Sequence, residues 1–144
     1  MHPVGFTNDP YSAGQNDKLI SINASLQVDF LGQCASESLG QTPYSGSGGQ
    51  TDFVRAANRS YGGKSFIVLP STAKQYTISR IRPMITQGSH ITVGKNDVNY
   101  VITEYGVAQL RGKTNRQRTK ELIAIAHPQF REELTAEAKR MNFL

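Results

Sequence analysis

The spacing of apolar residues along the chain predicts several short strands and a smaller number of helices. Apolar positions recur near period two over residues 19–30, which favours a bent strand or a hairpin followed by a turn at Gly32. A buried strand is expected at 65–69 and must stop before Pro70. Further β-rich runs at 76–81, 91–93 and 98–105 bring the predicted sheet to about five strands.

Helical patterns occupy most of the remaining chain. Residues 52–58 have helical character, with Asp52 as the expected N-cap and the glycine pair at 62–63 as the expected stop. Residues 106–110 are predicted to form a short turn, and helices are predicted at 114–126 and 128–141. Residues 1–18 lack periodicity and are predicted to be an irregular entry segment. This order predicts a single α/β domain over residues 1–144, with a mixed open sheet flanked by helices.

Composition limits the class of protein without choosing a function. The chain has 144 residues, of which 38% are hydrophobic, and no apolar run approaches the roughly 20 residues that a membrane span requires. Neither a membrane partner nor a secretory leader is expected, so a cytoplasmic or organelle-matrix location is favoured. The single cysteine, Cys34, is predicted to be a buried structural residue.

The net charge of +5 predicts a surface that attracts anions such as nucleic acid, anionic lipid or a polyphosphate ligand. The densest basic stretch, at 111–120, is predicted to be a solvated helix face with its leading loop. No nucleic-acid motif accompanies it, so no nucleic-acid partner is expected. The histidines His2 and His90 lack partners at metal-ligand spacing, and no metal is predicted. His127 precedes a proline and is predicted to be a capping or packing residue.

Three segments could carry chemistry. Glycines at 46–49 precede a predicted helix, where backbone N–H groups can point at a negative charge, although a merely tight turn would leave the same pattern. Lys74 follows the predicted buried strand, where ligands often bind in α/β sheets, but a solvated surface lysine is an equal alternative. Glu104 lies between a strand and a glycine turn, where either a catalytic base or a structural carboxylate is displayed.

Taken together, these segments resemble the C-terminal domain of the acetyl-CoA hydrolase/transferase family, which includes enzymes like 4-hydroxybutyrate CoA-transferase. The matching motifs follow the family order over nearly the whole chain: SINASLQVDFLGQCASESLG, SGSGGQTDF, GGK, PSTAK with SRI, DVNYVITEYGVAQLRGK and ELIAIAHPQFR. The resemblance implies a CoA-transferase-like (NagB/RpiA-like) fold. It also implies an enzyme that moves CoA between an acyl-CoA and a small carboxylate, such as acetate or 4-hydroxybutyrate, through a glutamyl-CoA intermediate.

Roles for individual residues follow from the same resemblance. Gly49 matches the glycine whose backbone N–H forms half of an oxyanion hole, and Lys74 matches a lysine that contacts CoA. Asn8 matches an asparagine close to the reacting carbonyl, and Ser25 lies at a position that approaches CoA. The attacking glutamate of the family lies upstream of the matched segments, so it is expected outside this chain, and Glu104 is interpreted as a structural, cleft-shaping residue. Gln75 and Tyr76 replace a glycine-containing stretch that the family has after the lysine.

The chain is expected to be the C-terminal domain of a CoA-transferase, inactive alone, with the N-terminal domain of the same enzyme and acyl-CoA as partners and a homodimer as the favoured assembly. An acyl-CoA hydrolase would use the same intermediate with water as acceptor. A non-catalytic CoA-binding module is the alternative from another class.

Overall fold

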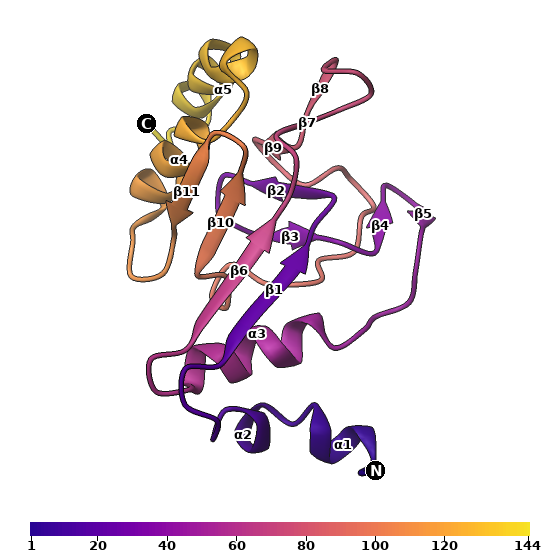
Figure 1. Cartoon of the computed structure of the whole chain (residues 1–144). Coiled ribbons are helices and arrows are strands. Elements are labelled where there is room, and N and C mark those ends of the chain that lie inside the picture. Colours follow the sequence, from indigo (N-terminus) through magenta and orange to yellow (C-terminus); the bar gives the residue numbers. More distant parts are fainter.

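The computed structural model describes residues 1–144 and is built around a four-stranded sheet. Its strands are β1 (Ile20–Ala24), β6 (Lys64–Val68), β10 (Tyr100–Thr103) and β11 (Gly106–Gln109), in the order β1-β6-β10-β11 (Figure 1). Strands β1 and β10 both run parallel to β6, and β11 returns antiparallel to β10. The predicted mixed open sheet is therefore confirmed.

The other strands form smaller sheets, so the prediction of one sheet with about five strands is wrong. Strands β2 (Gln27–Asp29), β3 (Cys34–Ala35) and β9 (Ile81–Arg82) form a three-stranded sheet in the order β3-β2-β9. The remaining strands have two residues each and form two separate hairpins. These are β4 (Ser38–Leu39) with β5 (Thr42–Pro43) and β7 (Thr72–Ala73) with β8 (Ile78–Ser79). The predicted strand at 91–93 contributes only a single bridge, from Val93 to Cys34.

Helices cover one face of the four-stranded sheet. Helix α3 (Gln50–Arg59) packs on β1 and β6, α4 (Asn115–Ala124) packs on β11, and α5 (Pro128–Arg140) packs on α4. A capping box at Thr114 starts α4, and the His127 ring caps α5 by accepting a hydrogen bond from the Gln129 N–H, which confirms the predicted capping role. The predicted helices at 114–126 and 128–141 are confirmed within two residues at each end.

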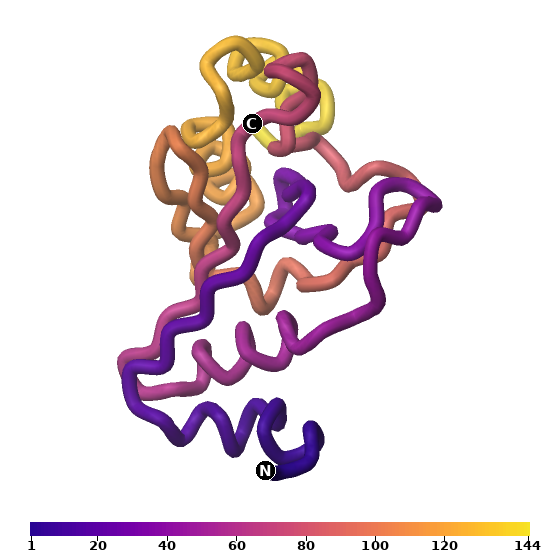
Figure 2. The backbone as a smooth tube through the Cα atoms, turned by 45° about the vertical axis from the view of Figure 1, so that its right-hand side comes forward, coloured from indigo at the N-terminus to yellow at the C-terminus, as the bar shows by residue number.

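Three local predictions are wrong for identifiable reasons. Residues 1–18 contain two four-residue helices, α1 (Val4–Thr7) and α2 (Pro10–Ala13), which are too short to leave a periodic pattern and lie beside α3 (Figure 2). Asp52 is not the N-cap of α3, because the helix begins at Gln50 with Gly49 at the cap position. Residues 106–109 form strand β11, since Gly106 adopts a φ of 141° and lets the chain reverse directly out of β10.

The hydrophobic core lies between the helix-covered face of the four-stranded sheet and the three-stranded sheet. Its largest fully buried side chains include Phe30, Ile67, Leu110 and Leu122. Cys34 is also fully buried in this core, and burial raises the pKa of its thiol, so the side chain remains a neutral packing group. No helix in the structure has the length and apolar character needed to cross a bilayer.

A buried arginine joins three segments of the fold. The Arg118 guanidinium donates to the backbone carbonyls of Leu31, Lys95 and Lys113, at 3.0, 2.6 and 3.2 Å. Arg118 has no carboxylate partner and is 8% exposed, so these carbonyls replace the water that its charge has lost. Helix α4 is thereby fastened to two loops.

We therefore expect Arg118→Ala to lower the free energy of unfolding by roughly 2–3 kcal/mol, because carbonyl groups lose their donors. Urea denaturation followed by circular dichroism measures the change. Arg116→Ala is the matched control, since Arg116 lies on the exposed side of the same helix and should change stability little. Equal stability of the two variants would contradict the proposed role of Arg118.

Candidate functional site

The carboxyl ends of β1, β6 and β10 lie at one edge of the four-stranded sheet because these strands are parallel. Ser25, Ser71 and Glu104 follow these strands closely in the chain and are gathered at this edge. Ligands in open α/β sheets commonly bind at such an edge. This edge of the sheet is therefore a candidate site.

Glu104 bridges the ends of β10 and β6. Its two carboxylate oxygens accept hydrogen bonds from the Ser71 N–H at 2.9 Å and the Ser71 hydroxyl at 2.6 Å. Desolvation alone would raise the pKa of Glu104, but the hydrogen bonds from Ser71 and the nearby His127 outweigh it and lower that pKa. Glu104 is thus held as a carboxylate, and its position agrees with the predicted structural, cleft-shaping role.

Lys74 lies beside this bridge at the tip of the β7–β8 hairpin. It lines one cavity of about 360 Å³ together with Pro70, Gln75, Tyr76 and Glu104. It also lines a second cavity, of about 320 Å³. The lysine is exposed, so its ammonium group is accessible from solvent.

The second cavity is cationic. Three of its lining residues are Lys74, Arg80 and Arg82, and no Asp or Glu lines it. Arg80 donates to the backbone carbonyls of Thr72 and Leu26, whereas Nε of Arg82 is buried and makes no hydrogen bond. Apolar surface comes from Leu26, Leu39, Tyr44 and Ile78. A cavity with this lining suits an anionic ligand that also has an apolar or aromatic part.

Sequence reasoning missed Arg80 and Arg82 as candidates. The sequence did contain a signal for this pair, because residues two apart in an extended segment point to the same side. What the sequence did not indicate was the opposite wall of the cavity, which comes from Leu39 and Tyr44, more than thirty residues earlier.

The structure brings Asn8 and Gly49 together. A Cβ atom added to Gly49 would lie 2.6 Å from Nδ2 of Asn8 and 3.1 Å from the Phe53 ring. Oδ1 of Asn8 accepts a hydrogen bond from the Thr7 hydroxyl, which leaves the Nδ2 donor on the Gly49 side. The close approach requires a residue without a side chain at position 49.

Two hydrogen-bond donors at this point, one on the backbone and one on a side chain, have no acceptors within the protein. Gly49 caps α3 without any side-chain acceptor, and its N–H makes no hydrogen bond. Nε2 of the next residue, Gln50, is buried and also unpaired. Gly49 is half-buried and not sealed in the core. Free N–H groups at the start of a ten-residue helix favour negative charge, so Asn8, Gly49 and Gln50 form a donor cluster.

The four predicted site residues do not form one cluster. Lys74 lines the cationic cavity, and Ser25 immediately precedes Leu26 in its wall, but the Ser25 hydroxyl points inward and donates to the carbonyls of Gln27 and Ala35. Asn8 and Gly49 lie apart from both, at the start of α3. The exposed loop between Tyr44 and Gly49 connects the cationic cavity to the donor cluster.

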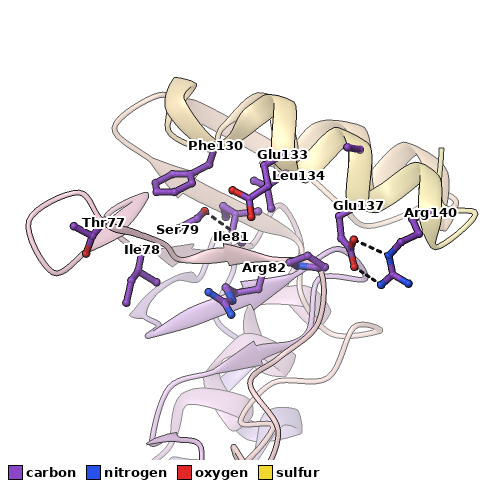
Figure 3. Close-up of a pocket in the computed structure, with 12 residues that line it drawn as sticks. Thr77, Ile78, Ser79, Ile81, Arg82, Phe130, Glu133, Leu134, Glu137 and Arg140 are labelled. Atoms are coloured by element: carbon purple, nitrogen blue, oxygen red, sulfur yellow. Dashed lines mark hydrogen bonds and ion pairs between the residues drawn. The ribbon is translucent and has the colours of Figure 1, made fainter.

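The largest described cavity, of about 610 Å³, lies elsewhere (Figure 3). It separates β8 and β9 from α5, and its walls include Ile78, Phe130 and Leu134 with the Glu137–Arg140 ion pair at one end. None of the predicted site residues lines it. No group of three or more His, Cys, Asp or Glu side chains is arranged to hold a metal ion.

Comparison with known proteins identifies the class to which this fold and these motifs belong. The family model described as acetyl-CoA hydrolase/transferase C-terminal domain matches residues 1–138. The chain therefore belongs to the acetyl-CoA hydrolase/transferase family and corresponds to its C-terminal domain.

Individual relatives agree with this assignment. A succinyl-CoA:cyclohexane-1-carboxylate CoA transferase of Geobacter metallireducens is 61% identical over 99% of this chain, and a 4-hydroxybutyrate coenzyme A transferase of Clostridium kluyveri is 50% identical over 96%. The crystal structure of RipA from Yersinia pestis is 46% identical, covers 99% of this chain and superimposes with a TM-score of 0.92. The chain spans 32% of the length of each of these three proteins.

We expect Ser71→Ala to raise the pKa of Glu104, because the variant removes the hydroxyl donor that stabilises the carboxylate. Titration of the Glu104 side-chain carboxyl carbon by NMR measures the shift, with Ser47→Ala in the exposed glycine loop as control. A carboxyl pKa below its ordinary value of 4.5 stabilises the fold above that pH, and the contribution is lost as the pH falls through the lowered pKa. Ser71→Ala should make this loss smaller, and an unchanged Glu104 titration would contradict the bridge.

Proposed function

We propose that this chain is the C-terminal part of an acyl-CoA:carboxylate CoA-transferase and forms one wall of its active site. The observation that carries the proposal is the cavity lined by Lys74, Arg80 and Arg82 without an acidic residue. It is supported by membership of the family and by relatives that are named CoA transferases.

Coenzyme A has the chemistry that this cavity favours. Its phosphate groups are anionic and its adenine is a flat, largely apolar ring. In the proposed complex, Lys74, Arg80 and Arg82 attract the phosphates, and Tyr44 and Leu39 provide a surface for the adenine. Ser25 acts indirectly, because its inward hydroxyl fixes the corner that positions Leu26 in the cavity wall.

The donor cluster at the start of α3 is proposed to stabilise the reacting thioester. A glutamate carboxylate, contributed by a part of the enzyme that this chain does not span, attacks the thioester carbonyl, and the oxygen of that carbonyl becomes negative. The Gly49 N–H, together with Asn8, then stabilises the oxyanion, a contribution of roughly 3 kcal/mol per donor. CoA thiolate leaves and a mixed anhydride forms, after which the thiolate attacks the glutamyl carbonyl and releases the first carboxylate. The resulting glutamyl-CoA thioester passes CoA to the second carboxylate.

The location and assembly of the enzyme complete the proposal. Resemblance to the family favours a homodimer in the cytoplasm or an organelle matrix, with acyl-CoA and a small carboxylate as substrates and no metal ion. Which carboxylate is used depends on the acyl side of the pocket, which we assign to the rest of the enzyme.

The first test compares the 144-residue chain with a fusion in which the amino-terminal part of the Geobacter relative precedes it. We expect the chain alone to bind CoA weakly without turnover and the fusion to transfer CoA to an added carboxylate. Chromatography of the acyl-CoA products, with and without acceptor, measures transfer. Transfer by the chain alone would overturn the proposal. Free CoA formed by the fusion without acceptor would favour a hydrolase. CoA binding by the fusion without any turnover would favour a CoA-binding module.

The second test targets the oxyanion contact. In the same fusion, Gly49→Ala should lower kcat by roughly 10²-fold, because the new methyl group collides with Nδ2 of Asn8 and displaces the donors. Gly48→Ala is the matched control, since a Cβ atom there meets nothing within 4 Å. Rates for the two variants within about twofold of each other would rule out the role proposed for Gly49.

A further inference from the structure

One face of the four-stranded sheet has no covering layer in this chain. Side chains alternate along each strand, so the strand register shows which residues share that face. The uncovered, or bare, face carries Ile20, Ile22, Ala24, Phe66, Val68, Tyr100, Ile102 and Val107, with the polar residues Lys64 and Gln109 at the ends of their strands. The opposite face, which includes Ser65, Ile67, Val101 and Ala108, is buried under the helices.

The uncovered face is apolar and accessible. Ile22 is 68% exposed and Val107 is 55% exposed, on strands β1 and β11 at opposite edges of the sheet. Between them, the rings of Phe66 and Tyr100 stack across β6 and β10 with centroids 5.3 Å apart. Lys64 is the only charged residue on these rows, at one end of β6. Figure 1 shows no helix in front of β1 and β6.

A parallel sheet with one bare face departs from the normal rule for such sheets. Parallel strands are found almost only where both faces are covered, because the crossover connections place layers on both sides. Here three consecutive strands are parallel, and β1 is an edge strand with hydrogen bonds to β6 alone. An exposed apolar face beside a free parallel edge is a surface that normally lies inside a protein.

The occupant that best fits this face is the part of the enzyme that precedes the chain. The relatives are about three times as long as this chain, and the matching family model describes a C-terminal domain, so their additional residues come largely before the matched region. The amino terminus lies beside α3, toward the same end of the molecule as the start of β1 (Figures 1 and 2). A preceding segment therefore joins the chain at the end of the sheet where the free edge strand β1 begins.

We propose that this bare face is the docking surface for the amino-terminal part of the CoA-transferase, which supplies the missing layer of the sheet. The proposal rests on the proposed function, because it takes the longer relatives as the pattern for the whole enzyme. It has a consequence for the active site, since a body docked on this face also adjoins the carboxyl ends of β1, β6 and β10, where Glu104 and the Lys74 hairpin lie.

Cysteine labelling tests the proposal directly, because the single native thiol, Cys34, is fully buried. Ile22→Cys and Val107→Cys place a reactive thiol on the bare face. Lys120→Cys is the control, because it places a thiol on the exposed side of α4, and α4 packs on the opposite face of the sheet. Each variant is made both in the 144-residue chain and in the fusion with the amino-terminal part of the Geobacter relative. Peptide mass spectrometry then measures the rate of maleimide modification at each position, and unmodified Cys34 verifies folding.

We expect the thiols at positions 22 and 107 to react at least about tenfold more slowly in the fusion than in the chain, with no change at position 120. Equal rates at positions 22 and 107 in both proteins would overturn the proposal. Slow labelling of the chain alone, with a dimeric mass in solution, would also overturn it by showing that a second copy covers the face. CoA transfer by the same fusion is a separate readout. Protection without transfer would refute only the proposed function, and transfer without protection would refute only the docking surface.

Discussion

Hydrogen bonding of β6 to two parallel neighbours is the constraint on which the rest of the structure depends. The register of β6 with β1 and β10 places the carboxyl ends of all three strands at a single edge. The Glu104 carboxylate then closes that edge by taking both hydrogen bonds from Ser71. The β7–β8 hairpin begins directly after Ser71, so this contact also fixes the start of the hairpin that holds Lys74 at its tip. A shift of one residue in β10 would separate Glu104 from Ser71 and reverse every side chain of the strand.

The candidate site contains two kinds of positive group, charged side chains and the partial charges of N–H groups. Full positive charges from Lys74, Arg80 and Arg82 surround one cavity, where they attract an anion over a distance. Partial charges from Asn8 and the first N–H groups of α3 form the other part, where close approach is needed. Glu104, the acidic residue that lines a cavity together with Lys74, already receives two hydrogen bonds, which reduces its competition for the cations. This division suits a ligand with phosphates at one end and a reacting carbonyl at the other.

The sequence predicted those parts of the fold in which local pattern and burial coincide. The buried run of β6 and the amphipathic helices α4 and α5 were expected at nearly their observed positions. The second sheet was not predicted, because its two- and three-residue strands are held by long-range pairing such as Val28 with Ile81 and leave no periodicity. Gly49, Lys74, Asn8 and Ser25 were proposed from family motifs, but only the structure showed that Asn8 lies against Gly49 and that the Ser25 hydroxyl faces inward. Such relationships depend on tertiary packing between residues far apart in the chain.

The turn that carries Lys74 has an unusual backbone. Lys74, Gln75 and Tyr76 have φ values of 47°, 54° and 68°, and Thr77 secures the turn with two hydrogen bonds to the Lys74 carbonyl. Left-handed conformations disfavour residues with side chains by roughly 1–2 kcal/mol each, whereas glycine adopts them freely. None of the three residues is a glycine, so each bears this cost. The tip of this hairpin therefore stores backbone strain, which the two Thr77 hydrogen bonds and the pairing of β7 with β8 must offset.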